Sequence, residues 1–405
     1  MGIRNKRQII SWCFYDFANS SYSAVISAVV FPVFYANYIV GYGGDLWWGR
    51  AVSLSMAAVA LSSPFIGGIS DFGGMRKRFL FIYTLIAVIS VSMFSVIEKG
   101  MVVEGFLLIV IANIGMEGGV VFYNSFLTDI APKGYQGRVS SWGYAVGYAG
   151  SVISLVLALP LLRKGLYAEI WLLVALFFLV FSIPTFLYLP PDRKQGRLIP
   201  SASKGMKSSW RTLKNIWENR ESRKFLIAYL IYEDGVNTVI VFSSIFAAST
   251  FGFNAVELIG LYLVVQVTAL LGAFLMAKPI DLWGPKKVVS LSLILWSAVA
   301  VSAYFADSKQ EFYLVASIAG LGLGTVQASS RAFFAQFIPQ GHESEYFGVY
   351  SMVGKSSAII GPYSFGYIST FTGSQRLAAL FIAVFFLAGL MLIRMVKDGL
   401  PNVAK

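Results

Sequence analysis

Long apolar stretches follow one another along the whole chain, and they constrain its fold more than any other feature. A helix needs about 20 mostly apolar residues to cross the hydrocarbon core of a bilayer. We predict twelve such helices, at residues 12–39, 47–70, 79–97, 105–129, 139–162, 168–190, 224–250, 257–277, 288–306, 311–336, 346–370 and 375–396. With 57% hydrophobic and 13% charged residues, the composition also indicates an all-α membrane protein.

The second half of the chain repeats features of the first half. The stretch GGISDFGGMRKR at residues 67–78 matches AKPIDLWGPKKV at residues 277–288. The aligned pairs are Asp71 with Asp281, Gly74 with Gly284, Pro132 with Pro339, Gly134 with Gly341, and Gly147 with Gly354. Two membrane halves derived from one unit are implied, and such proteins usually move a solute through the seam between the halves.

The distribution of basic residues predicts the domain organisation and the orientation. We predict a six-helix bundle at 1–190, a basic linker at 191–223 and a second six-helix bundle at 224–405. Most of the 32 Lys and Arg residues lie in loops on the same side as both termini. The positive-inside rule places that side, with both termini, in the cytoplasm of a cell (plasma or inner) membrane. The net charge of +12 is then explained by loops that contact anionic lipid headgroups, and we expect no nucleic-acid partner.

The linker contains one amphipathic segment. Met206, Trp210, Leu213 and Trp217 recur at spacings of four, three and four residues, which places them on one face of a helix. We predict an interfacial helix on the cytoplasmic leaflet that tethers the two bundles.

Polar and charged residues inside the predicted spans indicate where a site lies. A charged group near the bilayer centre costs about 2.5–3.5 kcal/mol on insertion scales, so it is expected to face a cavity or a partner. The candidates for substrate binding and coupling are Asp16, Asn19, Ser20, Glu117, Asn124, Glu233, Asp234, Asn237, Gln327, Arg331 and Lys355. Asn124 and Arg331 occupy equivalent positions in the two halves, 207 residues apart (331 − 124).

Two interpretations of these residues remain open. In one, the polar faces converge on a cavity that takes a small-molecule substrate, and the buried acids couple transport to protons. In the other, Arg331 or Lys355 only neutralises Asp16, Glu117 or Glu233 as a buried pair that fixes packing.

Signatures of enzymes and of ATP-driven transport are missing from the sequence. The only histidine is His342, so neither a histidine pair for a metal nor a nucleophile with a histidine base is available. A glycine-rich nucleotide loop with Lys-Ser or Lys-Thr is also absent. We expect no enzyme activity, no metal and no cofactor, and we expect any coupling to use an ion gradient in a protein that works as a monomer.

Several motifs resemble known families. The loop with Gly67, Asp71, Gly74, Arg76 and Arg78 resembles the signature between the second and third helices of the major facilitator superfamily. Within that superfamily, several segments resemble the vacuole-effluxer-like family, which includes fungal autophagy-related vacuolar amino-acid exporters. These segments are WCFYDFANSSY (12–22), FYNSFLTDIAP (122–132), GYAVGYAG (143–150), YEDGVNT (232–238) and QASSRAFFAQFIPQGHESEYFGVY (327–350).

This resemblance implies twelve helices in two pseudo-symmetric six-helix bundles that work by alternating access, with export of amino acids or similar zwitterions. A gating role is implied for Gly67, Asp71, Gly74, Arg76 and Arg78, and for the repeat partners Asp281 and Gly284. Two other functions are considered: export of a different, more apolar compound, and a membrane scaffold or sensor that does not transport.

Overall fold

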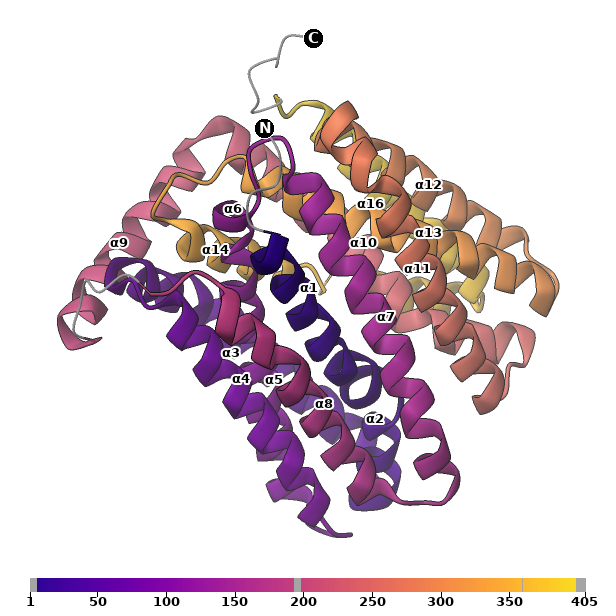
Figure 1. Cartoon of the computed structure of the whole chain (residues 1–405). Helices are drawn as coiled ribbons and strands as arrows, with labels where there is room; N and C mark the ends of the chain where they lie inside the picture. Colours follow the sequence, from indigo (N-terminus) through magenta and orange to yellow (C-terminus); the bar gives the residue numbers. More distant parts are fainter. Residues whose placement is uncertain (1–5, 193–197, 359, 398–405) are drawn as a thin grey trace. The chain divides into compact units, whose positions relative to one another are not determined.

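A computed structural model describes residues 6–192, 198–358 and 360–397. The described residues form helices joined by short loops and contain no strand (Figure 1). The termini that we expect in the cytoplasm, and residues 193–197 of the expected linker, lie outside the described residues.

The first half of the chain supplies the helices up to α8. Their bounds are α1 (Lys6–Ser21), η1 (Tyr22–Val29), α2 (Phe31–Val33), η2 (Phe34–Val40), α3 (Gly44–Gly73), α4 (Arg76–Met93), η3 (Phe94–Val96), α5 (Val102–Ser125), α6 (Leu127–Ile130), α7 (Gln136–Arg163) and α8 (Tyr167–Tyr188).

The linker and the second half supply the remaining helices. Their bounds are α9 (Leu198–Glu218), α10 (Arg220–Phe251), α11 (Ala255–Trp283), α12 (Pro285–Phe305), α13 (Lys309–Ala335), α14 (Glu343–Ser356), α15 (Ile360–Thr372) and α16 (Gln375–Arg394).

The predicted spans correspond to these helices, with two departures from continuous helix. Ten helices are long and apolar enough to cross a membrane, and the segments Lys6–Val29 and Phe31–Val40 form one further span with a bend of 41°. Pro32 lies at this bend, where it removes a backbone hydrogen bond. The stretch predicted at 346–370 is divided between α14 and α15 instead of forming one helix.

The chain divides into two compact units. Unit 1 comprises the described residues within 1–132, 146–213 and 339–352, and unit 2 comprises those within 133–145, 214–338 and 353–405. Unit 2 therefore includes the beginning of α7 from the first half of the sequence, and unit 1 includes most of α14 from the second half. These two segments are repeat equivalents, because 133 and 340 are again 207 positions apart (340 − 133). The boundaries expected at 190 and 224 stay a prediction.

The two units share one packing pattern. In unit 1, α5 packs against α3 and α4, and α8 packs against α1 and α4. In unit 2, α13 packs against α11 and α12, and α16 packs against α10 and α12. The helices α10, α11, α12, α13 and α16 thus occupy the places of α1, α3, α4, α5 and α8. The repeat in the sequence therefore corresponds to a repeat in the packing.

Buried aromatic residues fix the core of each unit. In unit 1, the Trp12 and Tyr123 rings stack at 4.4 Å, and Trp12 Nε1 donates to the Tyr123 carbonyl at 2.8 Å. In unit 2, Trp296 packs on Phe386 at 5.3 Å between ring centroids. These large side chains bury much apolar area, which makes them major contributors to the core of each unit.

The helix predicted in the linker is present as part of α9. Trp210 and Trp217 are 64% and 61% exposed, whereas Ser209 and Thr212 on another face are buried. Ser209 Oγ donates to the Pro64 carbonyl of α3 at 3.0 Å. The helix thus contacts the protein through this polar face and through the Trp210 ring, which meets Phe65 of α3 at 5.4 Å between ring centroids. Its contact with a lipid leaflet stays a prediction.

Candidate functional site

One guanidinium meets three carboxylates in unit 1. Arg76, in the first turn of α4, donates through Nε to Asp71 Oδ1 at 2.9 Å and through Nη1 to Asp129 Oδ2 at 2.7 Å. Its Nη2 donates to Glu343 Oε2 at the start of α14. Arg76 and Asp71 are buried, so these charge-assisted bonds are shielded from water.

The same aspartate holds the N-terminal turn of α14. Asp71 Oδ2 accepts a hydrogen bond from the Glu345 backbone amide at 2.9 Å. A Cβ at Gly67 would lie 2.3 Å from the Ser344 carbonyl oxygen, so only glycine lets α14 approach α3 this closely. Gly74 ends α3 with φ of 61°, a left-handed conformation that favours glycine.

The repeat partner Asp281 binds the N-terminal turn of α7 in unit 2. Its Oδ1 accepts from the Arg138 backbone amide at 3.2 Å, and its Oδ2 pairs with Arg138 Nε at 3.3 Å. Arg138 and Glu345 are repeat equivalents, since 345 − 138 is 207. Both aspartates therefore bind the N-terminal turn of a long helix, where backbone amides favour negative charge. Gly284, with φ of 85°, ends α11 as Gly74 ends α3.

Glu345 connects this cluster to the linker helix. Its Oε2 accepts from Thr212 Oγ1 of α9 at 2.5 Å and lies 2.8 Å from His342 Nδ1. The hydrogen bond to Glu345 raises the pKa of His342 above its usual value, although partial burial of the ring opposes this. The His342 charge therefore persists to higher pH than for an exposed histidine.

Within the spans of unit 2, a polar network surrounds Glu233. Gln327 Nε2 of α13 donates to Glu233 Oε1 at 2.9 Å, and the Tyr144 hydroxyl of α7 donates to Gln327 Oε1 at 3.3 Å. Lys355 of α14 lies close enough to attract the Glu233 carboxylate. Glu233 is 6% exposed, and its Oε2 accepts no hydrogen bond from the described residues.

Arg331 is the most deeply buried cation of this network, at 1% exposure. Its Nε donates to Ser140 Oγ at 2.9 Å, and its Nη2 donates to the Ser140 carbonyl at 2.7 Å. The guanidinium carbon lies 4.1 Å from the centre of the Tyr144 ring, a cation–π contact. Arg331 is therefore held by the beginning of α7 through a fork that lysine does not have.

Asp234 and Asn237 lie at the interruption between α14 and α15. The Gly361 backbone amide donates to both Asp234 carboxylate oxygens at 2.9 Å, so this side chain binds the N-terminal turn of α15. A Cβ at Gly361 would lie 2.8 Å from Asp234 Oδ1. Asn237 Nδ2 donates to Ser357 Oγ at 3.0 Å. These contacts satisfy polar groups that the break in the helix releases.

The polar residues of α1 lie against α7 in unit 1. Asp16 and Asn19 are 9% and 4% exposed. A Cβ at Gly147 would lie 3.0 Å from Ser20 Oγ and 3.2 Å from the Asp16 carboxyl carbon, and a Cβ at Gly150 would lie 2.2 Å from the Phe17 carbonyl oxygen. Small residues on α7 thus allow its close contact with the polar face of α1.

The polar residues of α5 are less uniform. Asn124 is 7% exposed, and Glu117 is half-buried and near enough to Tyr22 for the two to interact electrostatically. The Tyr22 hydroxyl donates to Asn113 Oδ1 at 2.7 Å, and Asn113 Nδ2 donates to Ser55 Oγ at 3.1 Å. These contacts link α3, α5 and η1 within unit 1.

Comparison with known proteins places the chain in a family. The model of the family described as "Vacuole effluxer Atg22 like" matches residues 50–399. The chain belongs to this Atg22-like family. It is 27% identical to YxiO of Bacillus subtilis, an uncharacterised MFS-type transporter. The alignment covers 98% of this chain and 96% of YxiO. The chain is 28% identical to autophagy-related protein 22 of Cryptococcus neoformans, over 61% of this chain and 48% of that protein.

Solved structures show that the Atg22-like chain has the major facilitator fold. The human organic anion transporter MFSD10 superposes with a TM-score of 0.78 at 13% identity, over 97% of this chain and all of the other. The major facilitator transporter FucP, in the outward conformation, superposes with a TM-score of 0.75 at 15% identity, over 96% and 98% of the two chains. The expected fold of twelve transmembrane helices in two pseudo-symmetric bundles is confirmed, as is the family. Transporter function and a multi-pass membrane location also follow.

The structure brings together part of the predicted set. In this Atg22-like protein, Glu233, Gln327, Arg331 and Lys355 gather in unit 2, whereas Asp234 and Asn237 bind the broken helix. In the gating loop, Arg78 lies apart from the Arg76 cluster: it pairs with Asp192 at 3.3 Å.

Sequence reasoning missed several partners. Six residues that were not predicted as site residues make hydrogen bonds to predicted ones. They are Asp129, Arg138, Ser140, Tyr144, Glu343 and Glu345. The repeat itself contained a usable signal, because the segments 133–145 and 340–352 are equivalent and each begins a long helix next to one of the repeated aspartates.

Proposed function

We propose that this Atg22-like protein is a secondary active transporter that exports amino acids or similar small zwitterions by alternating access. The observation that carries the proposal is the pair of buried groups Glu233 and Arg331, with the partly buried Gln327, inside membrane-spanning helices of unit 2. Burying these groups in lipid is expensive, so intramembrane ionisable residues commonly mark substrate or proton pathways.

The chemistry of this set suits a zwitterion. A guanidinium binds a carboxylate through two parallel hydrogen bonds, and a buried carboxylate binds an ammonium group. We assign Arg331 to the substrate carboxylate, and we assign Glu233, with Asp16 and Glu117 as further acids, to the ammonium group or to a coupling proton. Asn19, Ser20 and Asn124 offer additional hydrogen bonds from unit 1.

Gating is assigned to the repeated loops. Asp71 and Asp281 each bind the N-terminal turn of α14 or α7, and alternating access requires contacts of this kind to open and close. The ion pairs of Arg76 with Asp71, Asp129 and Glu343 would strengthen the gate at Asp71. Gly67 lets α14 lie close to α3, and Gly74 and Gly284 end the helices that carry the two aspartates.

One observation favours a second function, export of a more apolar compound. Both the Nε and the Nη2 of Arg331 already donate to Ser140. If this arrangement persists through the transport cycle, Arg331 fixes α7 and serves gating, and the substrate does not need a carboxylate.

Counterflow in proteoliposomes tests the proposal against this alternative. Vesicles with purified protein are loaded with one unlabelled amino acid at a time and then exposed to a trace of its labelled form. We expect labelled substrate to enter for at least one amino acid, and we expect Arg331→Gln to abolish its entry. Exchange of apolar amines or drugs without exchange of any amino acid would favour the second function.

A further inference from the structure

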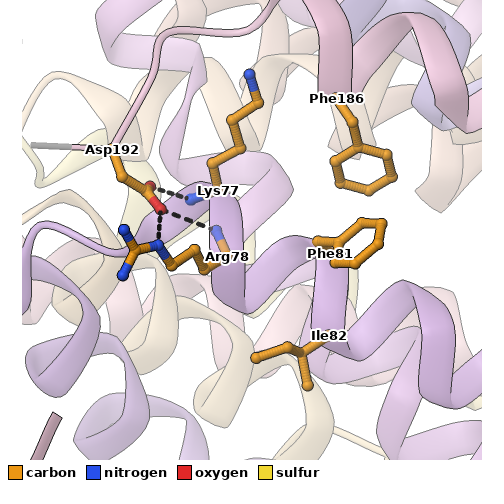
Figure 2. A pocket seen from close by; sticks show the side chains of 6 residues that line it. All are labelled: Lys77, Arg78, Phe81, Ile82, Phe186 and Asp192. Atoms are coloured by element: carbon orange, nitrogen blue, oxygen red, sulfur yellow. Dashed lines mark hydrogen bonds and ion pairs between the residues drawn. The ribbon is translucent and has the colours of Figure 1, made fainter.

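A groove outside the polar network lies between the first turn of α4 and the end of α8 in unit 1. Figure 2 shows its lining, with two aromatic rings on one side and Asp192 with the Arg78 guanidinium on the other. The groove has a volume of about 410 Å³ and is lined by Lys77, Arg78, Phe81, Ile82, Phe186 and Asp192. Its wall therefore combines an apolar part with a charged part.

The charged part leaves donors available. Asp192 Oδ1 accepts from the Lys77 amide at 2.7 Å, and Oδ2 accepts from the Arg78 amide at 3.2 Å. Arg78 Nε pairs with Oδ2 at 3.3 Å, whereas the Arg78 side chain is 65% exposed. Among the described residues, the Nη atoms of Arg78 have no carboxylate partner, and these two nitrogens can hold a phosphate oxygen pair.

The formal charges of the lining are complementary to one anion. Lys77 and Arg78 contribute two positive charges, and Asp192 contributes one negative charge, which leaves one net positive charge. Lys77 Nζ donates to the Leu189 carbonyl at 2.9 Å, so this ammonium group stays at the groove. A phosphodiester carries one negative charge and matches this balance.

The apolar part suits an acyl chain. Phe81 and Ile82 are 44% and 50% exposed on a membrane-spanning helix. The Phe81 and Phe186 rings meet edge to face at 5.1 Å, with 87° between their planes. Apolar side chains exposed in this way lie against lipid tails.

The position of the groove along the spans fits a headgroup. Arg78 is in the first turn of the span Arg76–Val96, and Phe186 is in the last turn of the span Tyr167–Tyr188. Ends of spans lie at the level of the lipid headgroups, where cationic side chains meet phosphates.

We propose that this groove is a binding site for one anionic phospholipid, whose phosphate contacts Arg78 and whose acyl chain lies along Phe81, Ile82 and Phe186. The site is independent of the transported substrate. The repeat does not reproduce it, because Val288, which aligns with Arg78 at an offset of 210 (288 − 78), is buried at 1% exposure.

Native mass spectrometry of the full-length protein in a mild detergent tests the site. Phosphatidylglycerol and phosphatidylcholine of identical acyl chains are titrated separately, and inorganic phosphate is added as a competitor. We expect one phosphatidylglycerol to bind roughly tenfold more tightly than phosphatidylcholine, because the quaternary ammonium of phosphatidylcholine offsets its phosphate charge beside a groove with a net positive charge. Millimolar inorganic phosphate should not displace it, because phosphate lacks the apolar part.

Variants separate the two parts of the groove. Arg78→Gln should remove the preference for phosphatidylglycerol, and the fold should persist because Arg78 is exposed and Asp192 keeps both amides. Phe81→Ala should weaken both lipids severalfold and retain the preference. Lys287→Gln is the matched control, because Lys287 is exposed in the repeated loop and contacts Trp283, not a groove of this kind.

Several results would overturn the proposal. They are equal affinity of the wild-type protein for both lipids, unchanged phosphatidylglycerol binding in Arg78→Gln, and displacement of the lipid by inorganic phosphate. A loss of binding in Lys287→Gln as large as in Arg78→Gln would also contradict it, since any cation would then suffice.

Discussion

At the scale of single residues, Arg331 is the side chain whose role matters most. Arg331→Lys keeps the positive charge but cannot make both hydrogen bonds to Ser140 and the stack on Tyr144. The lost bonds correspond to about 1.5–3 kcal/mol, so we expect exchange of substrate to fall roughly ten- to a hundredfold. Arg331→Gln should be worse, because it also removes the positive charge that we assign to the substrate carboxylate.

The two Arg331 variants distinguish recognition from coupling when binding and flux are measured together. Normal transport by Arg331→Lys would show that the fork is unnecessary and that charge pairing is sufficient. If both variants still bind substrate but lose flux driven by a pH gradient, Arg331 belongs to coupling, and the substrate anchor is then sought at Lys355.

His342 makes one contact of the gate dependent on pH. Its folded-state pKa is raised, so the pair with Glu345 stabilises the fold fully below about pH 6.5, the ordinary histidine pKa. This contribution is lost as the pH rises through the raised value. As the pH rises from below 6.5 to above the raised pKa of His342, we expect the Tm of the wild-type protein to fall relative to the Tm of His342→Gln.

A scan of Tm from pH 5.5 to pH 8.5 measures this difference. Lys207→Gln, which alters an exposed cation of the same linker helix, serves as the control and should follow the wild-type curve. Parallel curves for wild type and His342→Gln would show that the pair contributes nothing measurable.

At the scale of helices, the gate consists of two equivalent contacts. Asp71→Asn replaces a charged acceptor for Arg76 and for the Glu345 amide by a neutral one, with a loss on the order of 1.5–3 kcal/mol. We therefore expect α14 to move away from α3 in a larger fraction of molecules. Spin labels at the exposed positions 72 and 340 report this distance by electron paramagnetic resonance.

The repeat supplies the matched comparison. Asp281→Asn makes the same chemical change in unit 2, and it should leave the distance between positions 72 and 340 less affected than Asp71→Asn does. An unchanged distance distribution in Asp71→Asn would reduce Asp71 to a packing residue.

The sequence allowed most helices to be predicted, because each span is a long apolar stretch with charged ends. The break between α14 and α15 was missed, since residues 346–370 are mostly apolar and Asp234, which binds the N-terminal turn of α15, comes from a distant helix. Ser140 was missed for a similar reason. Its two bonds to Arg331 depend on the packing of α7 with α13, and a serine within a helix has no distinctive local pattern.

At the scale of the whole molecule, the distribution of basic residues predicts the orientation in the membrane. The positive-inside rule predicts that the linker is cytoplasmic, and Lys204 is an exposed residue of α9. With Cys13→Ser as background, a cysteine introduced by Lys204→Cys should react with a membrane-impermeant maleimide only after the cells are permeabilised. Labelling of intact cells would reverse the orientation.

The central claim is that the molecule couples amino-acid movement to an ion gradient. Accumulation of a labelled amino acid in proteoliposomes under an imposed pH gradient, tested with either sign, measures this directly. We predict that the wild-type protein concentrates at least one amino acid, and that Glu233→Gln still exchanges it without accumulating it. Failure of the wild-type protein, with its fold retained, to accumulate any amino acid under either gradient would contradict the account, whether or not it exchanges one.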